Sequence, residues 1–279
     1  YKVYDAINIA IDDPISSERI IECLPFFVKW MESDEEIFSD PSMTSIFSGL
    51  LTLLALRPNQ SSLEILGSSQ ILVSALLNIG VDKDAYVQLL SDLDDISGDG
   101  IGASQVYWLL ELVEELYQHS SPDSNVRSNF FHKVAAKIKS VYNRLTQAQT
   151  KSVNLLFHEL ELHIPEGIAG SQDVEENRWA QLENKKIGIY TLNESAGRRA
   201  GQILKDLEPS LQVSINSQHA GSDQLKALSE NSDYFLISWL SAKHAATDFI
   251  RQHRPAEDII YATGKGASSI VRCIEVALR

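Results

Sequence analysis

The chain has 279 residues, of which 44% are hydrophobic and 22% charged, and its formal net charge is −14. This length is sufficient for one large domain or two smaller ones. No apolar run reaches the ~18 residues of a membrane-spanning helix, and no secretory signal is visible. The two cysteines, Cys23 and Cys273, lie far apart within apolar helical patterns and are expected to be buried thiols in a reducing compartment. We therefore expect a cytoplasmic protein that makes no membrane contact.

The negative charge is concentrated in the first part of the chain. Residues 1–123 contain 5 Lys and Arg against 21 Asp and Glu, whereas residues 185–279 contain 12 against 10. The acidic part would repel nucleic-acid phosphates, so we expect any anion-binding site to lie in the last third. The acidic surface itself is expected either to keep the helices solvated or to bind a basic protein partner.

Residues 1–165 are predicted to form a helical domain, because their apolar residues recur three and four positions apart. Pro25 lies inside the first clear helical run and is expected to bend or divide it. Only Tyr1–Ile11 shows a hint of strand alternation. Further helices are expected at Ser61–Leu66, Ser69–Ile79, Lys83–Leu93 and Ala103–His119.

A break at residues 120–124 marks a possible sub-boundary in this helical domain. It is followed by a long helical pattern, which is either one helix or two helices joined near Gln147–Gln149, and which is expected to end at Pro165-Glu166-Gly167. Residues 166–184 are mostly polar and acidic, so they are predicted to form a linker that docks through Trp179.

Residues 185–279 alternate short apolar runs with helical periodicity. The expected strands are Lys186–Leu192, Gln212–Asn216, Tyr234–Trp239 and Asp258–Thr263. The expected helices are Ser195–Leu207, Ser222–Glu230, Ala242–Gln252 and Ala267–Leu278. Parallel strands need crossover connections, which are usually helices. With right-handed crossovers and a central first strand, we predict a four-stranded parallel, Rossmann-like α/β domain of strand order 2-1-3-4. The predicted fold class is therefore α + α/β.

The turns after the predicted strands carry the candidate site residues. In a parallel sheet these turns meet at the carboxyl end of the strands, where helix N-termini offer free N–H groups and a positive dipole. These features, with added Lys and Arg charge, suit an anionic ligand such as a nucleotide or a nucleic-acid backbone. Ordinary helix caps and surface charges are the alternative explanation. The candidates are Ser195, Arg198, Arg199, Ser241, Lys243, His244, Gly264, Lys265, Ser268 and Ser269.

Two metal-binding patterns are incomplete. Asp95–Gly100 imitates the start of a calcium loop, but position twelve is Val106 instead of a bidentate Glu. His158 and His163 are five residues apart, which places them on different faces of a helix. We therefore predict no metal site and no cofactor.

Catalytic residues are not assigned. Ser195 does not lie in a Gly-x-Ser-x-Gly elbow, and no acidic residue is identifiable to orient His244. A nucleotide hydrolase or glycosidase that uses the carboxyl end of the sheet is the alternative.

The segment Lys186–Leu278 resembles the DUF2325 family of bacterial proteins of unknown function. The resemblance rests on Asn231–Ile237, on Lys243-His244-Ala245 followed by a helix with Arg251, and on Gly264–Ile270, where the family has a Gly-x-Ser-Ser turn that opens the last helix. It implies a Rossmann-like or response-regulator-like domain in a bacterial protein, and it implies no established activity.

Our main hypothesis is a non-enzymatic regulatory or interaction module. The chain begins at Tyr1 without methionine, so we expect it to be a piece of a larger bacterial protein. The α/β domain at 185–279 would bind the anionic ligand and the acidic helices a protein partner; family context suggests antiviral defence. A nucleotide-processing enzyme and a ligand-free scaffold are the alternatives, and the sequence does not set the oligomeric state.

Overall fold

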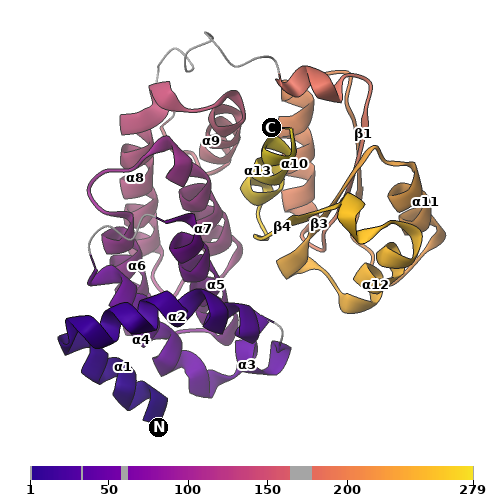
Figure 1. The fold of residues 1–279 in the computed structure, drawn as a ribbon. Helices are drawn as coiled ribbons and strands as arrows, with labels where there is room; N and C mark the ends of the chain where they lie inside the picture. Colours follow the sequence, from indigo (N-terminus) through magenta and orange to yellow (C-terminus); the bar gives the residue numbers. More distant parts are fainter. Residues whose placement is uncertain (1, 33, 58–61, 164–177, 279) are drawn as a thin grey trace. The chain divides into compact units, whose positions relative to one another are not determined.

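The computed structural model describes residues 2–32, 34–57, 62–163 and 178–278 (Figure 1). The chain forms two compact units, residues 1–140 and 141–279. The described part of the first unit is helical, and the second unit contains a β-sheet. No helix in these described ranges is long and apolar enough to cross a membrane.

Capping residues define the ends of several helices in the first unit. The side chains of Asp34, Ser62 and Asp82 accept hydrogen bonds from backbone N–H groups of the helices that follow them. Gly98, with a φ of 63°, ends the helix at Ser97. The elements are α1 (Lys2–Asp12), α2 (Pro14–Glu32), α3 (Glu35–Ser39), η1 (Pro41–Met43), α4 (Thr44–Ala55), α5 (Leu63–Ile79), α6 (Lys83–Ser97), η2 (Ala103–Gln105), α7 (Val106–Gln118) and α8 (Ser124–Val141).

Three expectations for this unit were wrong. The segment Tyr1–Ile11 is not a strand, because α1 buries Ile7 and Ala10, three residues apart, and packs on α4. The two helices expected between residues 61 and 79 are the single helix α5, which is buried along most of its length. Cys23 is exposed on α2 and not buried. Pro25 lies inside helix α2, which continues past it, so this proline does not divide the helix.

The long helical pattern after residue 124 is two helices. Helix α8 ends at Val141, the 3-10 helix η3 covers Tyr142–Arg144, and α9 spans Gln147–Glu159. A capping box starts α9: Gln149 N–H donates to Thr146 Oγ1 at 3.2 Å, and Thr146 N–H donates to Gln149 Oε1 at 3.0 Å.

Helix α9 packs against two helices of the α/β unit, α10 (Glu194–Leu207) and α13 (Ala267–Ala277). The two compact units therefore divide after Ser140, earlier than the end of the helical region expected at residue 165. Trp179, in the 3-10 helix η4 (Arg178–Leu182), is 2% exposed and belongs to the same core. The expected helix stop at residues 165–167 and the linker up to residue 177 lie outside the described residues. Independent folding of residues 185–279 stays a prediction.

The sheet confirms the predicted fold. Its strands are all parallel and have the order β2-β1-β3-β4. The remaining elements are β1 (Lys186–Tyr190), β2 (Gln212–Asn216), α11 (Asp223–Asn231), β3 (Tyr234–Ser238), η5 (Trp239–Ser241), α12 (His244–His253), η6 (Ala256–Asp258) and β4 (Ile259–Ala262).

Helices cover both faces of the sheet: α10 and α13 lie on one face, α11 and α12 on the other (Figure 1). Ile187 and Ile189 of β1 pack under α10 and α13, whereas Tyr190 packs under α11 and α12. Helix α10 approaches the sheet closely because Gly197 has no side chain; a Cβ there would lie 3.0 Å from Cγ2 of Ile215. This close packing sets the position of the first turns of α10, where the candidate residues lie.

Candidate anion-binding site

The turns at the carboxyl end of the sheet are joined by hydrogen bonds. Thr191 Oγ1, after β1, lies 2.7 Å from Ser241 Oγ. The Ser241 hydroxyl donates to Ser238 Oγ at 3.0 Å, and Ser238 donates to the Gly264 carbonyl at 2.9 Å. The Gly264 N–H in turn donates to Ser269 Oγ at 2.8 Å. Because each hydroxyl has one hydrogen, Thr191 must be the donor to Ser241.

Tyr190 extends this network to the turn after β2. Its hydroxyl donates to the Gln218 carbonyl at 3.0 Å. The side chain is fully buried, and this burial raises the pKa of Tyr190. The Leu192 N–H donates to the Ser241 carbonyl at 2.8 Å, which joins the turns that follow β1 and β3. The carboxyl ends of these two strands form the topological switch point of the sheet, where ligands bind in many α/β proteins.

Several candidates have structural partners in this network. Ser268 and Ser269 are each 1% exposed, and Gly264 is also buried. The Lys265 carbonyl accepts a hydrogen bond of 3.2 Å from Asn193 Nδ2. Lys243 is exposed at the N-cap of α12. His244 is the first residue of α12, and its side chain is outside what the structure describes.

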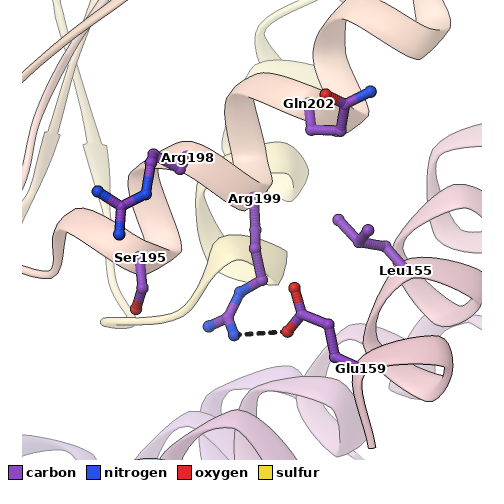
Figure 2. Close-up of a pocket in the computed structure, with 6 residues that line it drawn as sticks. All are labelled: Leu155, Glu159, Ser195, Arg198, Arg199 and Gln202. Carbon is purple, nitrogen blue, oxygen red and sulfur yellow. Dashed lines mark hydrogen bonds and ion pairs between the residues drawn. The ribbon is translucent and has the colours of Figure 1, made fainter. Parts of the chain in front are cut away.

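Three candidates instead line one pocket. Ser195, Arg198 and Arg199, in the first two turns of α10, line a pocket of about 400 Å³. The guanidinium of Arg199 points toward Glu159, whereas that of Arg198 points away from α9 (Figure 2). Gln202 of α10 and Leu155 and Glu159 of α9 complete its lining. The structure thus brings together those candidates that follow β1, in the first two turns of α10.

The two arginines in this pocket differ in environment. Arg199 is 12% exposed, and its Nη1 lies 2.9 Å from Oε2 of Glu159. Arg198 Nη1 lies 3.2 Å from Glu194 Oε2, and both of these side chains are mostly exposed. Exposed pairs of this kind contribute little to stability. An incoming anion can therefore take Arg198 from Glu194 easily, but it must compete with Glu159 for Arg199.

The N-terminus of α10 adds polar groups to the same place. Asn193 caps the helix, since its Oδ1 accepts the Ala196 N–H at 3.1 Å and the Ser195 hydroxyl at 2.9 Å. Ser195 is an exposed residue, and the positive end of the helix dipole lies here. The site therefore combines guanidinium groups, a hydroxyl and a helix N-terminus.

The candidate residues did not include Thr191, nor Asn193 and Ser238 of the turns that follow the first and third strands, although Asn before a helix is a recognisable cap. They also did not include Glu159 and Leu155, because α9 was assigned to the helical domain. Nothing in their sequence marks them as neighbours of α10.

Neither incomplete metal pattern forms a site in the structure. Asp95 and Ser97 lie in the last turn of α6, where Ser97 Oγ donates to the Asp94 carbonyl at 2.7 Å. His158 and His163 are both exposed. Among the described residues, no group of three or more His, Cys, Asp or Glu side chains is placed to hold a metal ion.

Comparison with known proteins gives one family. No curated protein and no solved structure matches the chain significantly. The resemblance of Lys186–Leu278 to DUF2325 therefore stays unconfirmed. Residues 10–273 match the model of the DpdD-like family, which is nearly the whole chain. The chain belongs to the DpdD-like family.

Proposed function

We propose that this chain is a non-enzymatic regulatory or interaction module of a bacterial DNA-modification or defence system. Membership of the DpdD-like family supports this setting. The α/β unit binds an anionic group, the phosphate of a nucleotide or of a nucleic-acid backbone. The observation that carries this proposal is the convergence of Ser195, Arg198 and Arg199 on one pocket at the N-terminus of α10.

The binding mode follows from the groups present. A phosphate oxygen is recognised by guanidinium groups and by helix N-termini. Arg198 gives the first contact because its guanidinium is exposed. Arg199 then exchanges Glu159 for the phosphate, so the affinity depends on how strongly Glu159 holds it. Recognition falls on α10 because the Ser241 and Ser269 hydroxyls are engaged within the fold.

The second half of the proposal concerns the helical unit. Residues 1–140 contain 9 Lys and Arg against 21 Asp and Glu. Such a surface attracts basic partners and repels nucleic acid. The helical unit therefore contacts a basic protein, while the α/β unit holds the anion.

The anion site is tested by titrating the protein into a labelled short DNA duplex and, separately, a labelled mononucleotide at low salt. Arg198→Glu should weaken binding by about tenfold or more, because a hydrogen bond to a charged group contributes ~1.5–3 kcal/mol. Lys205→Glu is the matched control: it makes the same charge change on an exposed residue of α10, but Lys205 does not line the pocket.

The two ligands give distinguishable results. Duplex binding should weaken with salt by a log–log slope of about −0.9 per phosphate contacted. Mononucleotide binding should depend on Ser195 as well as on the arginines. Equal effects of Arg198→Glu and Lys205→Glu, or no binding of either ligand, would contradict the proposal and favour a ligand-free scaffold.

A further inference from the structure

The pocket beside α10 has a charged end and an uncharged end. At the charged end, Arg199 Nη1 lies 2.9 Å from Glu159 Oε2. The uncharged end is lined by Leu155, one turn before Glu159 on α9, and by Gln202, about one turn after Arg199 on α10. Figure 2 shows both residues on the same side of the ion pair. The pocket can therefore hold an uncharged group next to the phosphate that its arginines bind.

The size of the pocket suits a single nucleotide. Ser195 and Gln202 are seven residues apart on α10, about 10 Å along the helix axis, which one nucleotide spans from its phosphate to its base. The volume of about 400 Å³ lies within the range of about 300–1,000 Å³ of small-molecule sites. A nucleic-acid backbone repeats its phosphate at every nucleotide and needs a row of cations. Beyond Gln202, however, the exposed Lys205 and Asp206 cancel in charge.

Asp206 fixes the orientation of the Gln202 amide. Gln202 Nε2 donates to Asp206 Oδ1 at 2.8 Å, and because a carboxylate only accepts, the amide nitrogen and not its oxygen faces Asp206. The amide keeps its second N–H and its carbonyl oxygen for a ligand. One donor beside one acceptor matches N7 and the N6 amino group of adenine, which glutamine recognises with two hydrogen bonds. Guanine presents two acceptors there and can take only the N–H.

We propose that this pocket binds a single adenine nucleotide. The phosphate lies at the charged end, and the base lies at the uncharged end, where Gln202 reads its edge. Leu155, which packs on the α/β core, gives the base an apolar contact. Gln202 is thus a specificity residue and Asp206 its positioning residue. The inference rests on the anion site of the proposed function, for which it names the class of ligand.

The ligand class is tested by isothermal titration calorimetry with adenosine 5′-monophosphate (AMP), guanosine 5′-monophosphate (GMP) and ribose 5-phosphate at low salt. AMP should bind about tenfold more tightly than GMP, because a two-bond contact distinguishes the two bases. Ribose 5-phosphate should bind most weakly, because it has no base to contact Leu155 and Gln202.

Variants at the uncharged end test the roles of its residues. Gln202→Leu should weaken AMP binding by about tenfold and leave ribose 5-phosphate binding unchanged. Gln224→Leu is the matched control, since Gln224 is an exposed glutamine on α11 that does not line the pocket; it should change neither affinity. Asp206→Asn should reduce the preference for AMP over GMP, because an asparagine can pair with either end of the Gln202 amide. Circular dichroism checks that each variant is folded.

The outcomes separate this inference from the proposed function. Equal affinities for AMP, GMP and ribose 5-phosphate, in binding that Arg198→Glu still weakens, would overturn the inference and leave the anion site standing. Binding of the DNA duplex without binding of AMP would do the same. A preference for AMP that survives Gln202→Leu would overturn the role of the uncharged end. Absence of binding to AMP, ribose 5-phosphate and the duplex would contradict both proposals.

Discussion

The two units of this chain place their functional residues in different ways. In the α/β unit, parallel strands bring every turn that follows a strand to one end of the sheet, so residues far apart in sequence become neighbours. The helical unit has no sheet and therefore no such rule. The charges differ as well: 9 Lys and Arg against 21 Asp and Glu in residues 1–140, but 15 against 17 in residues 141–279. The first unit therefore carries most of the net negative charge of the chain, and the second is nearly neutral.

The largest expected effect is on the free energy of unfolding, which should depend much more on a buried tryptophan than on an exposed one. Trp179→Ala should reduce the free energy of unfolding by ~3–5 kcal/mol, since it leaves a cavity in the α/β core. Trp30→Ala should cost less than about 1 kcal/mol, because that side chain is mostly exposed. Urea unfolding monitored by circular dichroism measures both. Similar losses in the two variants would show that the Trp30 side chain is part of a core.

A second prediction concerns the hydrogen bonds at the carboxyl end of the sheet. Ser238→Ala should cost ~1–3 kcal/mol, because it leaves the buried Gly264 carbonyl and the Ser241 hydroxyl without their partner. Ser195→Ala is the control; its exposed hydroxyl donates only to Asn193, so it should have little effect on stability. Equal effects of both variants in thermal unfolding would argue that the network has no structural role.

Some features of the fold and of the candidate site could be predicted from the sequence, and others could not. The strand Gln212–Asn216 was predicted with the observed bounds, because Val213 and Ile215 alternate with polar residues as in a partly buried strand. The strand order was also correct, because it follows from right-handed crossovers and a central first strand. The assignment of α9 to the second unit could not be predicted, since its apolar spacing continues that of α8. Nor could the burial of Ser268 and Ser269, because small residues at a helix start suit a ligand contact and a close packing contact equally.

A third, smaller effect is the pH dependence of the helical unit. Burial alone would raise the pKa of Asp94, but hydrogen bonds from Lys133 and Lys137 outweigh it and lower that pKa. A lowered carboxyl pKa stabilises the fold above the unfolded-state pKa, and this contribution is lost as the pH falls through the folded-state pKa. Asp94→Asn should therefore destabilise the protein by about 1 kcal/mol at neutral pH.

The same substitution should have little effect at a pH below the folded-state pKa of Asp94. Asp92, two residues earlier, has the opposite sign, because burial raises its pKa, and its protonation favours the folded state. Urea unfolding at neutral and acidic pH distinguishes the two residues. An Asp94→Asn effect that is independent of pH would contradict the role of its two lysine partners.

The competition between Glu159 and an anion for Arg199 is the central claim for the α/β unit, and Glu159→Gln tests it most directly. The 2.9 Å ion pair holds Arg199 in the unliganded protein. Removing the carboxylate charge should release the arginine and strengthen binding of the labelled DNA duplex or mononucleotide by about three- to tenfold, roughly 0.7–1.4 kcal/mol. Arg199→Gln should weaken that binding in the same assay. Unchanged or weaker binding by a folded Glu159→Gln protein would contradict the account, because the pair would then serve only to join α9 to α10.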